Sequence, residues 1–275
     1  MQTAIKIFLP IICFFALISK FNFDLSPRGI VFCVLFAVWG VYFVKTIIFS
    51  KNFEVKTVNF VLILTILLFK LLNNLLIHSY TFENILFFFG LYLTAEIFSS
   101  KKTDFGFFWL TVLTTLFLPI KEYIQIFIGT PMRFLSAEII SKTLNLIGFS
   151  NITQSSVLIF ENNITDIGYS CSGSSTFWVI LVFISLISLF LNIKFSKKII
   201  YLSIFSLFTL FCLNTSRILI LTVLYNAFPI KENILSTVHI GLGIINFLII
   251  FCIVAYYLFK LSKETTKPEF IKRCN

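Results

Sequence analysis

Long apolar stretches with almost no charge dominate this sequence and restrict what it can fold into. They lie near 5–20, 29–49, 57–77, 83–99, 104–128, 173–193, 199–217 and 240–260. Crossing the hydrocarbon core of a bilayer takes about 20 apolar residues, with a lower limit of about 17. Hydrophobic residues make up 58% of the chain and charged residues 12%, against about 45–50% and about 25% in an ordinary globular protein. The pattern predicts an all-α polytopic membrane protein with about eight transmembrane helices.

The basic residues lie in short clusters between the apolar runs and indicate the orientation. With a cytoplasmic N-terminus, fourteen of the 22 basic residues fall on the inner side: Lys6, Lys45, Lys51, Lys56, Lys101, Lys102, Lys194, Lys197, Lys198, Lys260, Lys263, Lys267, Lys272 and Arg273. Cytoplasmic loops are enriched in Lys and Arg, so both ends are expected in the cytoplasm. The first run lacks a small-residue cleavage site and is interpreted as an uncleaved span. The net charge of +10 then reflects orientation, and no recognition motif indicates nucleic acid.

Residues 129–172 form the longest predicted external segment. Its first part begins near Pro131, ends at Gly148 and carries Glu138 and Lys142 four residues apart, which predicts a helix. Apolar residues recur in it at helix-like intervals: Leu135, Ile139, Leu144 and Ile147. We therefore expect a helix lying on the outer membrane surface. The following stretch, 155–170, combines β-prone and turn residues, which predicts a small β-like segment before the sixth span.

The stretch 198–228 is too long for one span and too short for two. We expect one crossing that ends near Asn214, with 218–228 lying at the outer interface or dipping into it. Irregular backbone at that depth is tolerated only where protein or a watery cavity covers it, which indicates a site.

This topology brings three reactive residues to the outer face from three segments. Cys171 and Ser172 precede the sixth span, and His239 opens the last one. Arg217 follows Lys198 by about 19 residues, roughly 28 Å of helix or one hydrocarbon thickness. The remaining cysteines show no CxxC pair and, inside apolar runs, behave as small hydrophobes.

Together the three residues have the chemistry of a thiol-dependent acyl transfer. A helix N-terminus and a nearby cation favour the thiolate of Cys171, and an imidazole can move its proton. A guanidinium can stabilise the oxyanion that forms when the thiolate attacks a carbonyl, and Gly173 permits close approach. Singly, each residue has an ordinary structural explanation: a packed cysteine, an anchoring arginine, a histidine reaching the headgroups.

Three short motifs resemble signatures of the exosortase/archaeosortase family: CSG at 171–173, NTSRI at 214–218 and HIGLG at 239–243. Members of that family are membrane cysteine transpeptidases that cleave C-terminal sorting tails of exported proteins. The resemblance covers about residues 110–260. Many members have an acidic residue and Ala before CSG, where this chain has Tyr169 and Ser170, and an aliphatic residue and Arg after it, where this chain has Ser174 and Ser175.

The resemblance implies Cys171 as the nucleophile of a thioester intermediate, Arg217 as the oxyanion-stabilising residue and His239 as the proton-transfer residue. Asn214 is expected to orient Arg217, and Ser172 and Gly173 to support the site. It also implies membrane-tethered secreted proteins with PEP-CTERM-like tails as partners, and a multi-pass protein of the inner (plasma) membrane with its site on the outer, periplasmic face. Neither a cofactor nor a metal is expected.

The predicted organisation is four N-terminal membrane helices in 1–103, a catalytic membrane region in 104–260 and a basic cytoplasmic tail in 261–275. A transporter would need charged residues near span centres or paired broken helices. A purely structural protein would leave the grouping of Cys, Arg and His to chance. Another integral membrane enzyme, such as a lipid or glycan transferase, would need a carboxylate cluster, whereas the three Asp and nine Glu are scattered.

Overall fold

A computed structural model describes residues 27–48, 85–86, 89–90, 92, 105–117, 120–161, 163–228 and 232–271. The spans predicted near 5–20 and 57–77, and most of 83–99, lie outside the described residues. The chain forms two compact units, residues 1–120 with 188–194 and residues 121–187 with 195–275. The predicted functional division at residues 103 and 260 stays a prediction.

In the first unit, α2 (Pro27–Ile48) packs against α5 (Phe105–Leu116) through aromatic side chains. The ring centroids of Trp39 and Phe107 lie 5.6 Å apart, and both side chains are fully buried. Trp39 Nε1 donates a hydrogen bond to Thr111 Oγ1 at 2.9 Å. A buried indole N–H needs such a partner, so this bond lets a large aromatic residue occupy the centre of an apolar contact.

The span predicted over 104–128 is wrong as a single helix. Helix α5 ends at Leu116, and the chain resumes as α6 (Ile120–Ile124), a π-helical turn (Gln125–Gly129) and α7 (Thr130–Leu146). The sequence carries Pro119 in the interval. Proline lacks the N–H of a helical residue and disfavours helical backbone before it, which accounts for the interruption.

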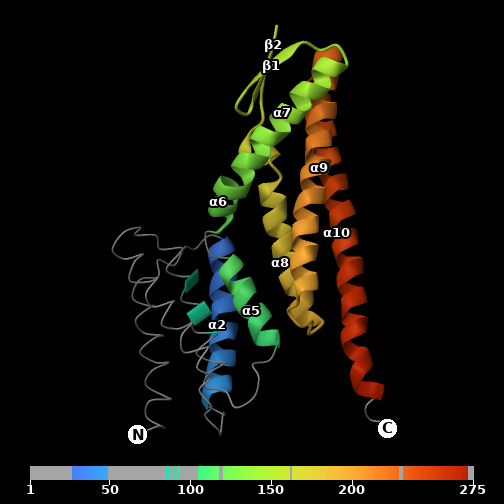
Figure 1. Ribbon diagram of the computed structural model, residues 1–275. Coiled ribbons are helices and arrows are strands. Elements are labelled where there is room, and N and C mark those ends of the chain that lie inside the picture. The colour runs from blue at the N-terminus through green and yellow to red at the C-terminus, as the bar shows by residue number, and fades with distance from the viewer. Residues whose placement is uncertain are drawn as a thin grey trace. The chain divides into compact units, whose positions relative to one another are not determined.

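Two long helices form the body of the second unit and run side by side (Figure 1). They are α9 (Lys197–Ala227) and α10 (Glu232–Ile271), while α8 (Ser174–Phe190) precedes them in the chain. Asn246 Nδ2 on α10 donates to the Leu213 carbonyl on α9 at 3.0 Å. An interhelical hydrogen bond of this kind fixes the register of two helices whose other contacts are apolar.

The irregular backbone considered for 218–228 is absent over 218–227, because helix α9 has 31 residues and runs unbroken to Ala227, about 46 Å at 1.5 Å per residue. Where the crossing ends stays a prediction. Polar side chains near Asn214 find partners within the fold: Thr215 Oγ1 lies 2.9 Å from Ser136 Oγ, and Ser216 Oγ donates to the Cys212 carbonyl. No Gly or Pro interrupts the stretch before Pro229, so nothing in it forces the helix to stop.

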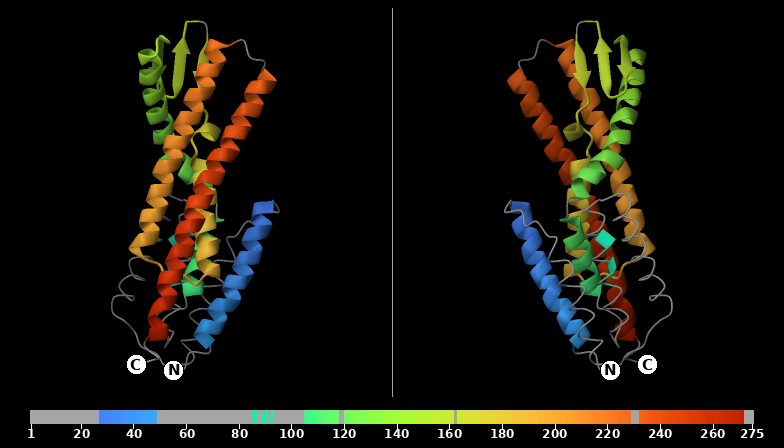
Figure 2. Two further views of the ribbon diagram at one scale, coloured as in Figure 1. Left: turned by 90° about the vertical axis from the view of Figure 1, so that its right-hand side faces the viewer. Right: turned by 90° about the vertical axis from the view of Figure 1, so that its left-hand side faces the viewer.

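The predicted helix and the β-like segment are both present, while the position of the helix on the membrane surface stays a prediction. Helix α7 is followed by an antiparallel sheet of order β1-β2-β3, formed by β1 (Asn151–Gln154), β2 (Val157–Phe160) and β3 (Ile164–Asp166). Figure 2 shows the strands between α7 and the upper part of α9. A buried core joins these elements: Ala137, Ile140, Leu144, Leu158, Ile167 and Ile218, with Cys171 packed against it.

The buried face of α7 differs from the apolar face that was expected. Ala137, Ile140 and Leu144 are fully buried, whereas Leu135 and Ile139 are exposed. The sheet and α9 cover one side of this helix, so Leu135 and Ile139 face outward, where a membrane-surface helix would contact lipid.

Within the described residues, 197–227 and 234–264 are long and apolar enough to cross a membrane, and the helices on either side of 118–119 add a third span if they count as one. The protein is therefore a mostly helical membrane protein with a small sheet. The number eight stays a prediction.

Candidate functional site

Cys171 lies at the wall of a cavity of about 330 Å³. It ends a short 3₁₀ turn (Tyr169–Cys171) that continues the chain from β3, and its side chain is half-buried. The cavity is lined by residues of β3, α9 and α10: Ile164, Thr165, Asp166, Ile167, Cys171, Ile218, Leu221, Thr222, Tyr225, Leu235 and His239. The thiol and the imidazole predicted to act together therefore share one cavity.

Arg217 lies just below this cavity, between α9 and α10. It precedes Leu221 by one helical turn on α9, and it faces Gly243, which follows His239 by one turn on α10. A Cβ atom at Gly243 would come within 2.9 Å of Arg217 Nη1. Gly243 therefore leaves the space that the Arg217 side chain occupies. The guanidinium is also close enough to His239 for their charges to interact. The Nε atom of Arg217 is buried and has no hydrogen-bond partner within the described part of the chain.

Asn214 connects α9 directly to the cysteine turn. Its side-chain Nδ2 donates a hydrogen bond to the Cys171 carbonyl, and the residue is almost fully buried. Arg217 follows it by nearly one turn on the same helix. The structure thus gives Asn214 a partner that was not expected: it holds the backbone of the proposed nucleophile.

The backbone conformation at position 173 favours glycine. Its φ of +78° is in the left-handed region that favours glycine. A Cβ atom there would lie 3.4 Å from Leu210 Cγ and 3.6 Å from Asn214 Cγ. The glycine therefore lets the chain turn from Cys171 into α8 with its backbone close to α9.

Ser172 and Ser174 form a buried hydroxyl pair at the start of α8. Their Oγ atoms lie 2.7 Å apart, Ser172 Oγ donates to the Tyr169 carbonyl, and the Ser174 backbone N–H donates to Ser172 Oγ. A side-chain oxygen that accepts from an otherwise unpaired N–H stabilises a helix start. Gly129 packs against the pair, since a Cβ there would be 2.9 Å from Ser174 Oγ. Ser172 is thus part of the support beneath Cys171.

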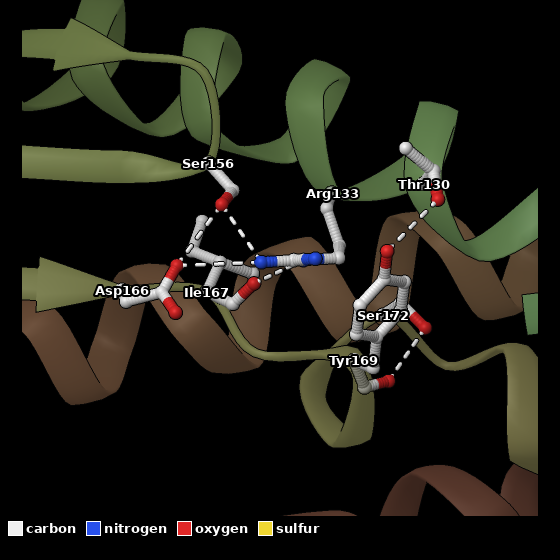
Figure 3. Close-up of polar contacts among 7 residues, drawn as sticks. All are labelled: Thr130, Arg133, Ser156, Asp166, Ile167, Tyr169 and Ser172. Carbon is white, nitrogen blue, oxygen red and sulfur yellow. Dashed lines mark hydrogen bonds and ion pairs between the residues drawn. The ribbon is translucent and has the colours of Figure 1, made fainter. Parts of the chain in front are cut away.

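Arg133 holds the other side of the cysteine turn, and no role was predicted for it. Figure 3 shows its side chain extending from α7 toward the chain between β3 and Tyr169. It donates from Nε to the Ile167 carbonyl and from Nη2 to Ser156 Oγ at 2.8 Å, and it lies 3.4 Å from Asp166 Oδ1. Its Cζ is 4.2 Å from the centre of the Tyr169 ring, a cation–π contact.

Among the residues singled out from the sequence, Cys171 and His239 share the cavity and Asn214 bonds to Cys171. Arg217 lies one turn from the cavity residue Leu221 on α9 and faces Gly243 on α10. The supporting roles of Arg133, Gly129, Gly243 and Asn246 were missed. For Arg133, the available signal was that the predicted external segment 129–172 has only two basic residues, Arg133 and Lys142. No group of three or more metal-binding side chains occurs within the described ranges.

Comparison with known families gives one match. A sequence model described as transmembrane exosortase matches residues 29–256. The chain belongs to the transmembrane exosortase family. Curated proteins and solved structures gave no significant match. Membership shows that this exosortase is membrane-embedded and suggests a cysteine transpeptidase rather than a transporter; the match extends beyond the 110–260 range of the motif resemblance.

Proposed function

We propose that this exosortase is a membrane-embedded cysteine peptidase and transpeptidase that cleaves C-terminal sorting tails of exported proteins. The observation that carries the proposal is the shared cavity of Cys171 and His239, with Arg217 one helical turn below it. A thiol, an imidazole and a guanidinium are the groups that nucleophilic attack on a peptide carbonyl requires.

In the proposed reaction, Cys171 Sγ attacks the carbonyl carbon of the scissile peptide bond. His239 takes the thiol proton, and the guanidinium of Arg217 stabilises the oxyanion. The C–N bond then breaks, and the proton passes from His239 to the leaving amine, which leaves a thioester on Cys171. Water or an acceptor amine attacks this thioester and restores the thiol. Asn214 helps to place the nucleophile, since its side chain donates a hydrogen bond to the Cys171 carbonyl.

The partners in this proposal are secreted proteins that remain tethered to the membrane by a C-terminal span, in the manner of PEP-CTERM-like tails. The site would lie on the outer, periplasmic face of the inner membrane, where such proteins arrive after export. Asn214, Ser172 and Gly173 are supporting residues because each touches the cysteine turn or the helices that frame it.

The test compares membrane and secreted proteins of the native host that carries wild-type protein, Cys171→Ala or Cys171→Ser. We expect both variants to accumulate normally and to leave tail-bearing precursors uncleaved, because a serine hydroxyl needs stronger base assistance than one imidazole provides. Cys212→Ala is the matched control, since Cys212 is an exposed cysteine on α9, and it should process normally. Wild-type processing by Cys171→Ala would end the proposal.

The two other residues are tested in the same cells. Arg217→Lys keeps the charge but loses the planar fork of donors, so we expect a severe loss of processing. His239→Ala is expected to leave a small residual activity, because Cys171 and Arg217 remain in place and water can still accept a proton. A variant of either residue with full activity would remove that residue from the mechanism.

A further inference from the structure

Strand β3 is an edge strand whose outer side is unpaired. Phe160 N donates to the Asn163 carbonyl at 2.8 Å, and Ile167 N donates to the Ser156 carbonyl at 3.0 Å. In an antiparallel pair, the residues that face the neighbouring strand alternate with residues that face away. Asn163, Thr165 and Ile167 therefore direct their backbone groups toward β2, and Ile164 and Asp166 direct theirs outward.

The outward backbone groups lie beside the proposed nucleophile. Residues 164–167 line the same cavity as Cys171 and His239, and the opposite wall comes from α9 and α10. By this alternation the backbone groups of Ile164 and Asp166 make no bonds to β2, and they have no other backbone partner within the described part of the chain. An open row of donors and acceptors thus runs along the cavity and leads in five residues from Asp166 to Cys171.

Size and charge indicate what occupies this space. A volume of about 330 Å³ is at the lower end of ligand sites, which run from about 300 to 1,000 Å³, and an added strand lies about 4.8 Å from its neighbour. Most lining side chains are apolar. The one carboxylate, on Asp166, already accepts from Ser156 and pairs with Arg133. The cavity therefore suits an uncharged, extended polypeptide.

We propose that the sorting tail binds as an added β-strand on the free edge of β3, with its scissile carbonyl presented to Cys171. This inference rests on the proposed function and adds the mode of substrate recognition. The segment that flanks the cut exchanges main-chain hydrogen bonds with Ile164 and Asp166, and its alternate side chains face α9 and α10. Main-chain pairing supplies affinity, and the pockets for alternate side chains supply selectivity.

The first test removes one outward N–H from β3. Ile164→Pro leaves the β2–β3 hydrogen bonds in place because the Ile164 N–H does not take part in them. We expect processing to fall about tenfold or more, through a lost hydrogen bond and a ring that blocks the edge. Ile164→Ala keeps the N–H, so its loss of processing should be clearly smaller than that of Ile164→Pro.

Thr153→Pro is the matched control on the opposite edge of the sheet. The Asn151 N–H bonds to Asn145 Oδ1 at 2.9 Å, so Asn151 and, by alternation, Thr153 point away from β2 on the side remote from the cavity. This variant should process as the wild type does. Equal losses in Ile164→Ala and Ile164→Pro, or wild-type processing by Ile164→Pro, would overturn the inference.

The second test changes the substrate and leaves the protein intact, so it holds even where a proline variant fails to accumulate. The probe is a synthetic peptide that copies the cleavage region of the precursor accumulating in Cys171→Ala cells. Each backbone amide is replaced in turn by an ester, which removes one N–H. We expect kcat/KM of the full-length enzyme to fall at every second position and to stay near wild type between them.

The outcomes separate this inference from the function on which it rests. Cleavage that depends on Cys171 but shows no period of two overturns strand addition alone. If Cys171→Ala cells accumulate no precursor, the proposed function fails and the inference falls with it. A period of two together with the proline result establishes strand addition.

Discussion

Gly241 and Gly243 lie two positions apart on α10 but have different surroundings. A Cβ at Gly241 would meet nothing within 4 Å, whereas one at Gly243 would lie 2.9 Å from Arg217 Nη1. Gly243→Ala must therefore displace the guanidinium. We expect it to reduce processing about tenfold or more, the size of effect seen when a transition-state donor is misplaced.

Gly241→Ala is the control for this prediction. Both changes raise helix propensity by about 1 kcal/mol, so neither should lower the amount of protein in the membrane. The measurement is the rate of precursor cleavage in cells matched for protein level. If both variants cleave at the wild-type rate, the position of Arg217 is not critical.

At the residue scale, the sequence was most informative about side chains with distinctive chemistry. The motifs singled out Cys171 and His239, which line one cavity. Gly243 was quoted as part of a motif, but its function as space for Arg217 depends on which face of α10 meets α9. The partners of Arg133 lie 23 to 34 residues away along the chain, and no local pattern encodes such distances.

Among the elements, α7 and the sheet depend on Arg133. Its side chain is only 11% exposed, bonds to Ser156 in the turn between β1 and β2 and to Ile167 just after β3, and pairs with Asp166 on β3. Hydrogen bonds to a charged group contribute about 1.5–3 kcal/mol each. We expect Arg133→Ala to loosen residues 151–171, and limited proteolysis of the membrane-inserted protein should then cut within this segment at least about tenfold faster.

Lys142→Ala provides the comparison on the same helix. Lys142 pairs with Glu138 at 2.7 Å, but both side chains are largely exposed, and exposed pairs of this kind contribute about 0.3–0.5 kcal/mol. The proteolysis rate should therefore change little. If the two variants are cut equally fast, Arg133 does not anchor the sheet.

Element boundaries were predictable where the sequence carries turn residues and unpredictable where tertiary contacts decide. Helix α7 starts one residue before Pro131, and Gly148 follows its end with a φ of +91°, as the helix signals indicated. An interruption after Asn214 was considered because 198–228 is too long for one span and too short for two, whereas α9 is continuous from Lys197 to Ala227. Contacts such as that between Thr215 and Ser136 satisfy its polar side chains inside the fold, and only the neighbouring elements show this.

For the whole molecule, the distribution of basic residues predicts which loops lie outside the cell membrane and which lie in the cytoplasm. Ser155, in the turn between β1 and β2, is exposed and should lie outside, whereas Ser196, just before α9, should lie in the cytoplasm. In intact cells, a membrane-impermeant thiol reagent should label Ser155→Cys but not Ser196→Cys. The parent protein gives the background from its own cysteines, and the opposite labelling pattern would place the cavity on the cytoplasmic side.

At the scale of the whole molecule, composition was sufficient to predict a membrane protein, and the match to the transmembrane exosortase model over residues 29–256 agrees with this prediction. The number of spans was not settled in the same way. Hydropathy marks apolar runs, but it does not show whether a run is one straight helix, and the predicted span 104–128 divides into several helical segments.

The length of α9 links the chemistry to the membrane itself. One continuous helix carries Asn214, Arg217 and four residues of the cavity wall, while His239 stands on its neighbour α10. A long hydrophobic helix adapts to bilayer thickness by tilting. Tilting of α9 against α10 would change the separation of the cysteine turn, the guanidinium and the imidazole. We therefore expect the rate of precursor cleavage by this exosortase to change with the acyl-chain length of the surrounding lipids.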